Sequence, residues 1–222
     1  MAAVLRTPPF NLVLSEIDDL AALRPMIGNL RGSPLPGVVG PPVVVSDFAH
    51  RWVAEVGGAW QVVLKERIFQ LSEVIDPRPA NGAPRLAIQS DRSLIEDWLV
   101  AFGWEALDDV DSEAVRRGLD AWERGLGRRF WLWEVDGRPV SIVGAGGETP
   151  NGIRIGPVYT LPSDRGQGYA SNLTAWVSRT LLAEGRRFCF LYTDLANPTS
   201  NKIYRAIGYV PVGDALMVAF TP

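Results

Sequence analysis

The spacing of apolar residues in the second half of the chain predicts helices and a β-hairpin. From Leu94 to Phe102, apolar residues recur every three or four positions, as they do on one face of a helix. Farther along, two apolar runs flank Asp136-Gly137, and such a dipeptide between such runs is a strong signal for a two-residue hairpin turn. We therefore expect a helix over 91–107, a second helix over 112–125 that Ser112 caps, and a hairpin over 130–147.

Beyond the hairpin, the chain alternates between strand and helix patterns. A strand pattern ends at a turn with two glycines, a helix pattern begins at Tyr169, and a continuous apolar run typical of a buried strand follows. Because strand–helix–strand connections join parallel strands by a right-handed crossover, we expect these two strands to be parallel. The predicted elements are strands over 85–91, 153–161 and 186–195, helices over 169–185 and 197–208, and one or two strands over 209–220.

The first part of the chain carries weaker patterns. It predicts a strand over 10–16, a helix over 46–57, and one long or two short strands over 60–74. Glycine and proline dominate 31–42, which predicts a loop, and a second such cluster at 76–84 marks a boundary. We thus expect an N-terminal α/β region at 1–83 and a larger domain at 84–222. A loose likeness between the two parts has two interpretations, a degenerate half-repeat of one fold or chance.

Composition narrows the classes of function. With 47% hydrophobic residues the chain of 222 can bury a core, and its net charge of −3 provides no basic surface for nucleic acid. Cys189 lies in an apolar run and His50 in a helix pattern, so we predict a buried core thiol and a helix-surface histidine, and neither a metal site nor a Ser-His-Asp triad. No signal peptide and no run of about 18 apolar residues is visible, which predicts a cytoplasmic protein without membrane contact.

The glycine turn in TLPSDRGQGYASNL, at 160–173, is the strongest candidate for chemistry. A Walker loop is excluded, because no Gly-Lys-Ser/Thr follows the glycines. The dinucleotide fingerprint fits poorly, since Ser171 replaces its third glycine and three antiparallel strands precede it. A ring of backbone N–H groups at a helix N-terminus, suited to a pyrophosphate, fits best. A tight turn whose glycines serve geometry alone is the alternative.

The strand before this turn contains Gly156-Pro157. Proline cannot donate to a β-ladder, so it marks a bulge or the end of pairing. If the strand separates there from its parallel neighbour, Tyr159 and Thr160 keep unpaired backbone groups, to which an extended ligand with amides can add like a strand. Pantetheine is such a ligand, and coenzyme A joins it to a pyrophosphate. The edge and the turn together indicate one ligand, an acyl-coenzyme A.

These residues resemble the GNAT superfamily of acetyl-CoA-dependent N-acyltransferases, and the resemblance covers 84–222. The turn is similar to the Arg-Gly-x-Gly form of the family's acyl-CoA signature, although Ser163 stands where the family has Gln or Arg. The family's second signature is an asparagine, a tyrosine seven residues later and then Gly-Phe/Tyr. The positions that fill the two signatures are Arg165, Gly166 and Gly168, then Asn197, Tyr204, Gly208 and Tyr209.

The resemblance implies a fold and a set of site residues. The fold is α/β of the α+β type, with a mixed, centrally splayed sheet flanked by helices. Tyr204 is implied as the general acid beside the thioester sulfur, and Asn197, with Asn201 one turn on, as a contact of pantetheine; helix packing and helix capping are the plain structural alternatives. The cofactor-binding positions are Val158, Tyr159 and Thr160 for pantetheine, and Arg165, Gly166, Gln167, Gly168, Tyr169, Ala170 and Ser171 for the pyrophosphate.

The implied reaction is direct transfer of an acetyl group from acetyl-CoA to a primary amine of a small molecule or peptide, with no metal. Glu134, Glu148 and Asp194 lie at or beside strand ends and are the candidate bases, although ordinary polar roles explain them as well. A non-catalytic acyl-CoA sensor is the alternative function. The retention of Tyr204 favours the enzyme, because a protein that only binds acyl-CoA does not need this hydroxyl.

Overall fold

The structure is a computed structural model that describes residues 3–107 and 110–221. The chain forms two compact units, each made of segments that are distant in sequence. The first unit comprises the residues up to Ile68, Tyr192–Asn201 and those from Pro211 on, and the second comprises Phe69–Leu191 and Lys202–Val210. The predicted start of the family domain at residue 84 stays a prediction.

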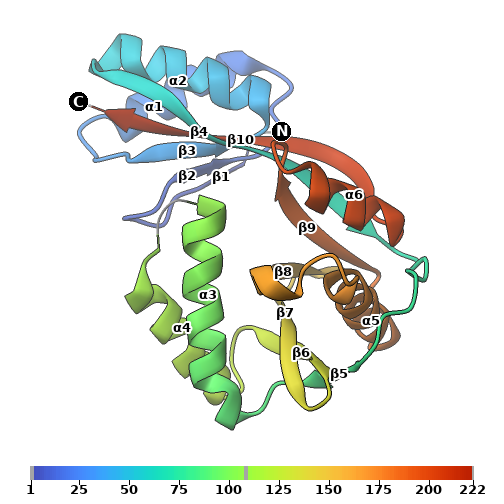
Figure 1. Ribbon diagram of the computed structural model, residues 1–222. Coiled ribbons are helices and arrows are strands. Elements are labelled where there is room, and N and C mark those ends of the chain that lie inside the picture. Colours follow the sequence, from blue (N-terminus) through green and yellow to red (C-terminus); the bar gives the residue numbers. More distant parts are fainter. Residues whose placement is uncertain (1–2, 108–109, 222) are drawn as a thin grey trace. The chain divides into compact units, whose positions relative to one another are not determined.

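The first unit is a mixed sheet with two helices, α1 and α2, along one side (Figure 1). Strand β2 runs parallel to β3, which in turn is antiparallel to β10. Val45, Phe48 and Trp52 share the buried face of α2 and pack into one apolar core. The elements are β1 (Val4–Leu5), β2 (Leu12–Leu14), α1 (Leu23–Leu30), β3 (Gly37–Gly40), α2 (Pro42–Val56), β4 (Ala59–Leu71) and β10 (Val210–Thr221).

The second unit contains a sheet in the spatial order β5-β6-β7-β8-β9. The pairs from β5 to β8 are antiparallel, while β8 and β9 are parallel as expected for a strand–helix–strand crossover. The elements are β5 (Ala83–Leu86), α3 (Arg92–Leu107), α4 (Ser112–Glu123), β6 (Arg129–Val135), β7 (Arg138–Gly146), β8 (Gly152–Thr160), α5 (Tyr169–Ala183), β9 (Phe188–Asp194) and α6 (Pro198–Ala206). The predicted α/β class, a mixed sheet flanked by helices, is confirmed.

Alternate side chains of this sheet pack on different helices. Ile142 of β7 lies in the cluster that α3 and α4 cover, whereas Val143 and Ala145 lie in the cluster with α5. The stripe predicted on α3 is confirmed, with Ile95 and Trp98 fully buried. Helices therefore cover residues on both faces of the sheet.

Strand β8 is irregular at Gly156-Pro157, as its proline predicts. The register between β7 and β8 shifts between Val143 and Ala145, opposite this dipeptide. On the other side of β8, the ladder to β9 that the structure describes joins Gly152–Arg154 to Phe188–Phe190. At Ile155 and from Val158 to Thr160, β8 thus pairs with β7, while the described ladder to β9 has ended.

Three local predictions are wrong. The strand expected over 85–91 ends at Leu86, and Gln89–Asp91 forms a 3-10 helix. The segment 31–42 is not a continuous loop, since Gly37–Gly40 is strand β3 and the first turn of α2 begins at Pro42. Glycine and proline are typical of loops, but proline is well tolerated in the first turn of a helix, as in α2. Strand β3 forms because β2 and β10 pair with it on its two edges. Helix α4 is capped by Asp111, whose side chain accepts from the N–H of Ala114 at 2.8 Å, and not by Ser112.

Candidate functional site

The N-terminus of α5 is an open ring of backbone donors. Gly166 and Gly168 take left-handed conformations, with φ of 79° and 84°, and Gly168 is the N-cap without any side chain to bond the first N–H groups of the helix. Arg165 to Gly168 are exposed. A Cβ at Gly166 would meet nothing within 4 Å, so the space before the turn is free. This geometry suits an anion with several oxygens, which is the chemistry of a pyrophosphate.

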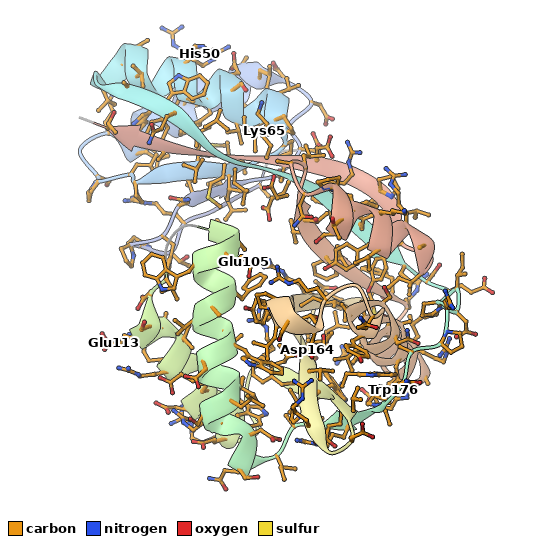
Figure 2. The ribbon with its side chains drawn as sticks, in the orientation of Figure 1. His50, Lys65, Glu105, Glu113, Asp164 and Trp176 are labelled. Atoms are coloured by element: carbon orange, nitrogen blue, oxygen red, sulfur yellow. The ribbon has the colours of Figure 1, made fainter. Side chains whose placement is uncertain are left out.

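Two side chains fix the loop that leads into this turn. Asp164, labelled in Figure 2, is almost fully buried. Its carboxylate accepts two hydrogen bonds from the Arg138 guanidinium of β7, at 2.7 and 3.0 Å. These bonds lower the pKa of the Asp164 carboxyl below its usual range. Asn172 donates at 3.0 Å both to the Gly168 carbonyl and to that of Arg78. The turn is therefore held in place before any ligand arrives, which limits the ordering cost of binding.

The exposed side chain of Arg165 is bound within its own unit. Its Nη atoms bind the carboxylate of Glu105 on α3, labelled in Figure 2, at 2.6 and 2.7 Å, and its Nε donates to the Thr160 carbonyl at 3.0 Å. It also lies over the ring of Tyr159, 5.7 Å from the centroid. The hydrogen bond from Arg165 lowers the pKa of Glu105. The expected pyrophosphate contact of Arg165 thus rests on its backbone, while its side chain ties the loop to α3.

Replacing either partner of this ion pair should have a similar effect. We expect Arg165→Ala and Glu105→Gln each to weaken acetyl-CoA binding by roughly 3- to 10-fold, because each frees the loop from α3. Calorimetric titration of both variants measures this. Glu113→Gln, which breaks the exposed Arg117–Glu113 pair of α4, is the matched control and should bind like wild type. A much larger loss in Arg165→Ala than in Glu105→Gln would instead mean that the guanidinium binds phosphate directly.

Strand β8 presents backbone groups next to this turn. Val158, Tyr159 and Thr160 pair with β7 on one edge. Ser141, fully buried on β7, lies 3.0 Å from the Tyr159 carbonyl and 2.8 Å from the Thr160 hydroxyl, and it holds this end of β8 in place. The predicted residues from Val158 to Ser171 lie on the end of β8, in the glycine turn after a short 3-10 helix (Pro162–Asp164), and at the start of α5, all in the second unit.

Tyr204 lies in the core of the same unit. It is 8% exposed and packs with Val158 in one apolar cluster, against Phe69 and Tyr209. Burial raises the pKa of its hydroxyl to about 12. The Tyr204 hydroxyl is thus protonated at physiological pH, as a proton donor must be. Its apolar cluster includes Val158 of β8.

The candidate bases of the second unit are engaged in ion pairs. Glu134 binds Arg85 at 2.7 Å, and the same guanidinium holds Asp91. Glu148, just beyond the end of β7, binds Arg186 at 2.7 Å. Both carboxylates therefore have structural partners, and a catalytic role for either stays a prediction.

The remaining predicted residues belong to the first unit. Asn197 caps α6, its side chain accepting from the Ser200 N–H at 3.0 Å, and Asn201 donates to the carbonyls of Asp194 and Asn197 at 2.9 and 2.7 Å. The Asp194 carboxylate accepts from the Ala196 N–H at 2.8 Å. The capping expected of Asn197 is confirmed, and the contacts of these three residues with a ligand stay predictions.

Three supporting residues escaped the sequence analysis. Asp164, Arg138 and Ser141 are distant in sequence, and no motif links them before the strands pair. The acidic residue directly before Arg165 was the available signal. A short polar side chain at the start of such a loop commonly bonds a neighbouring element.

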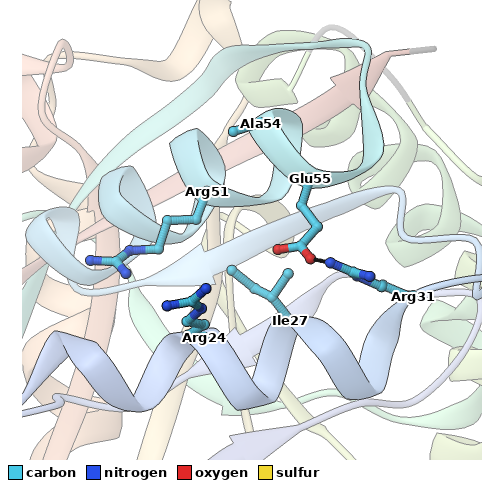
Figure 3. A pocket seen from close by; sticks show the side chains of 6 residues that line it. All are labelled: Arg24, Ile27, Arg31, Arg51, Ala54 and Glu55. Carbon is cyan, nitrogen blue, oxygen red and sulfur yellow. Dashed lines mark ion pairs between the residues drawn. The ribbon is translucent and has the colours of Figure 1, made fainter.

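A shallow pocket in the first unit lies between α1 and α2 (Figure 3). Its volume is 470 Å³ and three arginines line it. Two of these are paired, Arg51 with Asp47 and Arg31 with Glu55. With exposed walls and mostly compensated charges, the pocket does not define a ligand.

The described part of the chain offers neither a metal-binding cluster nor a membrane-spanning helix. Residues 3–107 and 110–221 contain no group of three or more His, Cys, Asp or Glu side chains that could hold a metal ion. Within the same residues, no helix combines the length and the apolar character that crossing a membrane requires.

Comparisons with known proteins bear on the family and on the fold. The sequence model of the Acetyltransferase (GNAT) family matches residues 92–209. The fold is similar to a GCN5-related N-acetyltransferase from Kribbella flavida (TM-score 0.67, 18% identity, covering 96% of this chain and 81% of that one). It is also similar to a GCN5-related N-acetyltransferase from Sphaerobacter thermophilus (TM-score 0.66, 15% identity, covering 99% and 76%). No curated protein sequence matches the chain.

Proposed function

Since the chain belongs to the Acetyltransferase (GNAT) family, we propose that it moves an acetyl group from acetyl-CoA directly to a primary amine of a small molecule or peptide. One observation carries the proposal. The edge of β8 beyond its described ladder to β9 is followed by a 3-10 helix (Pro162–Asp164) and the glycine turn, and then by the N-terminus of α5, whose N-cap makes no side-chain hydrogen bond. Strand edge and helix start together offer the backbone donors and acceptors that pantetheine and a pyrophosphate need, in the right order along the chain.

The residues present fit acetyl-CoA, which supplies an activated acetyl thioester when it binds. Backbone N–H groups from Gly166 to Ser171 hold the pyrophosphate, and backbone groups of Val158 to Thr160 orient the pantetheine arm. With this order, we expect the thioester to lie at the Gly156-Pro157 kink of β8. There, Tyr204 donates its hydroxyl proton to the leaving sulfur. A carboxylate, Glu134, Glu148 or Asp194, takes the proton of the attacking amine directly or through water.

The test has a binding part and a turnover part. Calorimetry should show one acetyl-CoA site per chain. Desulfo-CoA should bind with a comparable affinity, because the N–H groups before α5 and the edge of β8 contact neither the sulfur nor the acetyl group. Release of free thiol with a library of primary amines should then exceed release without amine. If acetyl-CoA does not bind, the assignment of the site is wrong.

A non-catalytic acyl-CoA sensor is the second candidate, and one observation favours it. Glu134 and Glu148 both bind arginines, and the Asp194 carboxylate bonds a turn, so each candidate base already has a partner. A sensor would bind acetyl-CoA tightly and release no thiol with any amine. Amine-dependent thiol release excludes it.

A further inference from the structure

Arg128, which directly precedes β6, is a partly buried cation with no anionic partner among residues 3–107 and 110–221. Its Nε atom is inaccessible to solvent and has no hydrogen-bond partner among the residues that the structure describes. Burial and the nearby positive charge of Arg154 both lower the pKa of its guanidinium. Because an arginine side chain stays charged in proteins, the cost of this burial is not relieved by deprotonation. Buried charges in proteins are normally paired, so an unpaired one calls for a function.

The sheet provides a dedicated space for this side chain. A Cβ on Gly146 of β7 would lie 3.1–3.2 Å from Cα, Cβ and Cγ of Arg128, and a Cβ on Gly144 would lie 3.0 Å from its Cδ. The aliphatic stem of Arg128 therefore rests on two glycines, where larger residues would displace it. Arg128 is on the same face of β6 as Phe130, which belongs to the cluster covered by α3 and α4.

The same space adjoins the kink of β8. The point at which a Gly144 Cβ would lie is 3.0 Å from the Gly156 carbonyl oxygen and 3.0 Å from Pro157 Cδ, as well as from Arg128. The proposed function places the thioester at this kink, with all the phosphates of the cofactor at the opposite end of β8. The acetyl group is neutral. The anion that Arg128 lacks at this position has to come from the acceptor.

We propose that Arg128 binds a carboxylate of the acceptor, so that the substrates are amines that carry a carboxylate, such as amino acids. This inference rests on the proposed function and names its substrate class. A guanidinium suits the role, because its fork of N–H donors matches a carboxylate in two-point contact. Arg128 is then a specificity-determining residue that takes no part in proton transfer.

The first experiment compares matched acceptors. Thiol release from acetyl-CoA is measured with L-amino acids of varied side chain and with their carboxamides, which keep the amine but lose the negative charge. We expect kcat/KM for at least one acid to exceed that of its amide by about 10-fold or more. In Arg128→Gln, the KM for the acid should rise about 10- to 100-fold while the values for the amide and for acetyl-CoA stay unchanged. Arg128→Lys should restore part of the preference, and Arg124→Gln, an exposed change, is the control.

The second experiment needs neither cofactor nor turnover. If Arg128 is an unpaired binding group, Arg128→Met removes a buried charge and should raise the apo-protein Tm by about 2–4 °C. A packing role predicts a lower Tm instead. N-acetyl-L-amino acids, added to the CoA-loaded protein, should stabilise wild type but not Arg128→Met.

The outcomes separate the two proposals. If acetyl-CoA binds and amides are used as well as acids, or if Arg128→Gln impairs both equally, the carboxylate assignment is overturned while the acetyltransferase stands. If CoA binds but no amino acid reacts and no N-acetyl-amino acid stabilises wild type, the carboxylate assignment is likewise overturned. If acetyl-CoA does not bind at all, the proposed function fails. Independently of that result, a lower Tm in Arg128→Met overturns the argument that Arg128 is an unpaired cation.

Discussion

Gly168→Asp should weaken acetyl-CoA binding by on the order of 100-fold. The substitution adds a Cβ to a residue whose φ is 84°, a conformation that glycine adopts most easily. It also places a carboxylate beside the first N–H groups of α5, which no side chain caps. The new carboxylate would accept hydrogen bonds from those N–H groups and would repel the pyrophosphate. Each charge-assisted hydrogen bond that the pyrophosphate loses is worth about 1.5–3 kcal/mol. Calorimetric titration with acetyl-CoA measures the loss, with circular dichroism to confirm that the variant is folded.

A glycine at the other end of α5 provides the matched control. Gly185 lies just beyond the C-terminal end of α5, its φ is 98°, and a Cβ there would meet nothing within 4 Å. Gly185→Asp thus imposes a similar backbone strain and the same charge at the other end of α5, and acetyl-CoA should bind it like wild type. Gly168→Ala isolates strain from charge and should lose less than Gly168→Asp. Equal affinities for Gly168→Asp and Gly185→Asp would refute the pyrophosphate site.

Tyr204→Phe should lower kcat on the order of 100-fold and change the KM for acetyl-CoA by less than about 3-fold. The ring is part of the apolar cluster with Phe69 and Tyr209, and phenylalanine preserves that packing. Only the hydroxyl, and with it the proton for the leaving sulfur, is lost. Steady-state kinetics with a reactive amine provide the measurement, and an unchanged kcat would remove Tyr204 from the mechanism.

The pH profile offers an independent check on Tyr204. A general acid acts in its protonated form, so activity that depends on it falls as pH rises through its pKa. Burial raises that pKa from an ordinary value of about 10 to about 12, and kcat should therefore stay level between about pH 9 and 10.5. A decline with an apparent pKa near 10 that Tyr204→Phe abolishes would show a hydroxyl in an ordinary aqueous environment instead.

Tyr209→Phe is the control for loss of a buried tyrosine hydroxyl. The Tyr209 hydroxyl bonds Ser178 of α5 at 2.9 Å and touches the same cluster. Its removal should cost about 1 kcal/mol of unfolding free energy, because the Ser178 partner remains buried, and should leave kcat unchanged. A loss of kcat equal to that of Tyr204→Phe would mean that packing, not proton donation, explains both.

Local patterns predicted most elements of the second unit. Helix α3, the hairpin at Asp136-Gly137 and the cap at Asn197 all follow from contacts between residues close in sequence, and each is confirmed. The proline of β8 correctly marked a bulge, because a missing N–H is a property of the residue itself. The strand at Gly37–Gly40 was missed, since its stability comes from β2 and β10, which lie far away in sequence.

Residue types and their spacing were enough to identify the glycine turn, the interrupted strand and the family, because a nest of N–H groups depends on a few consecutive dihedral angles. Sequence could not say what the charged side chains bind. Arg165 binds Glu105 and Arg138 binds Asp164, both between elements far apart in sequence. Arg128 lies on two glycines of β7, with no anion beside it in the described part of the chain. Electrostatic interactions depend on distance and burial, and both are created only when the strands and helices pack.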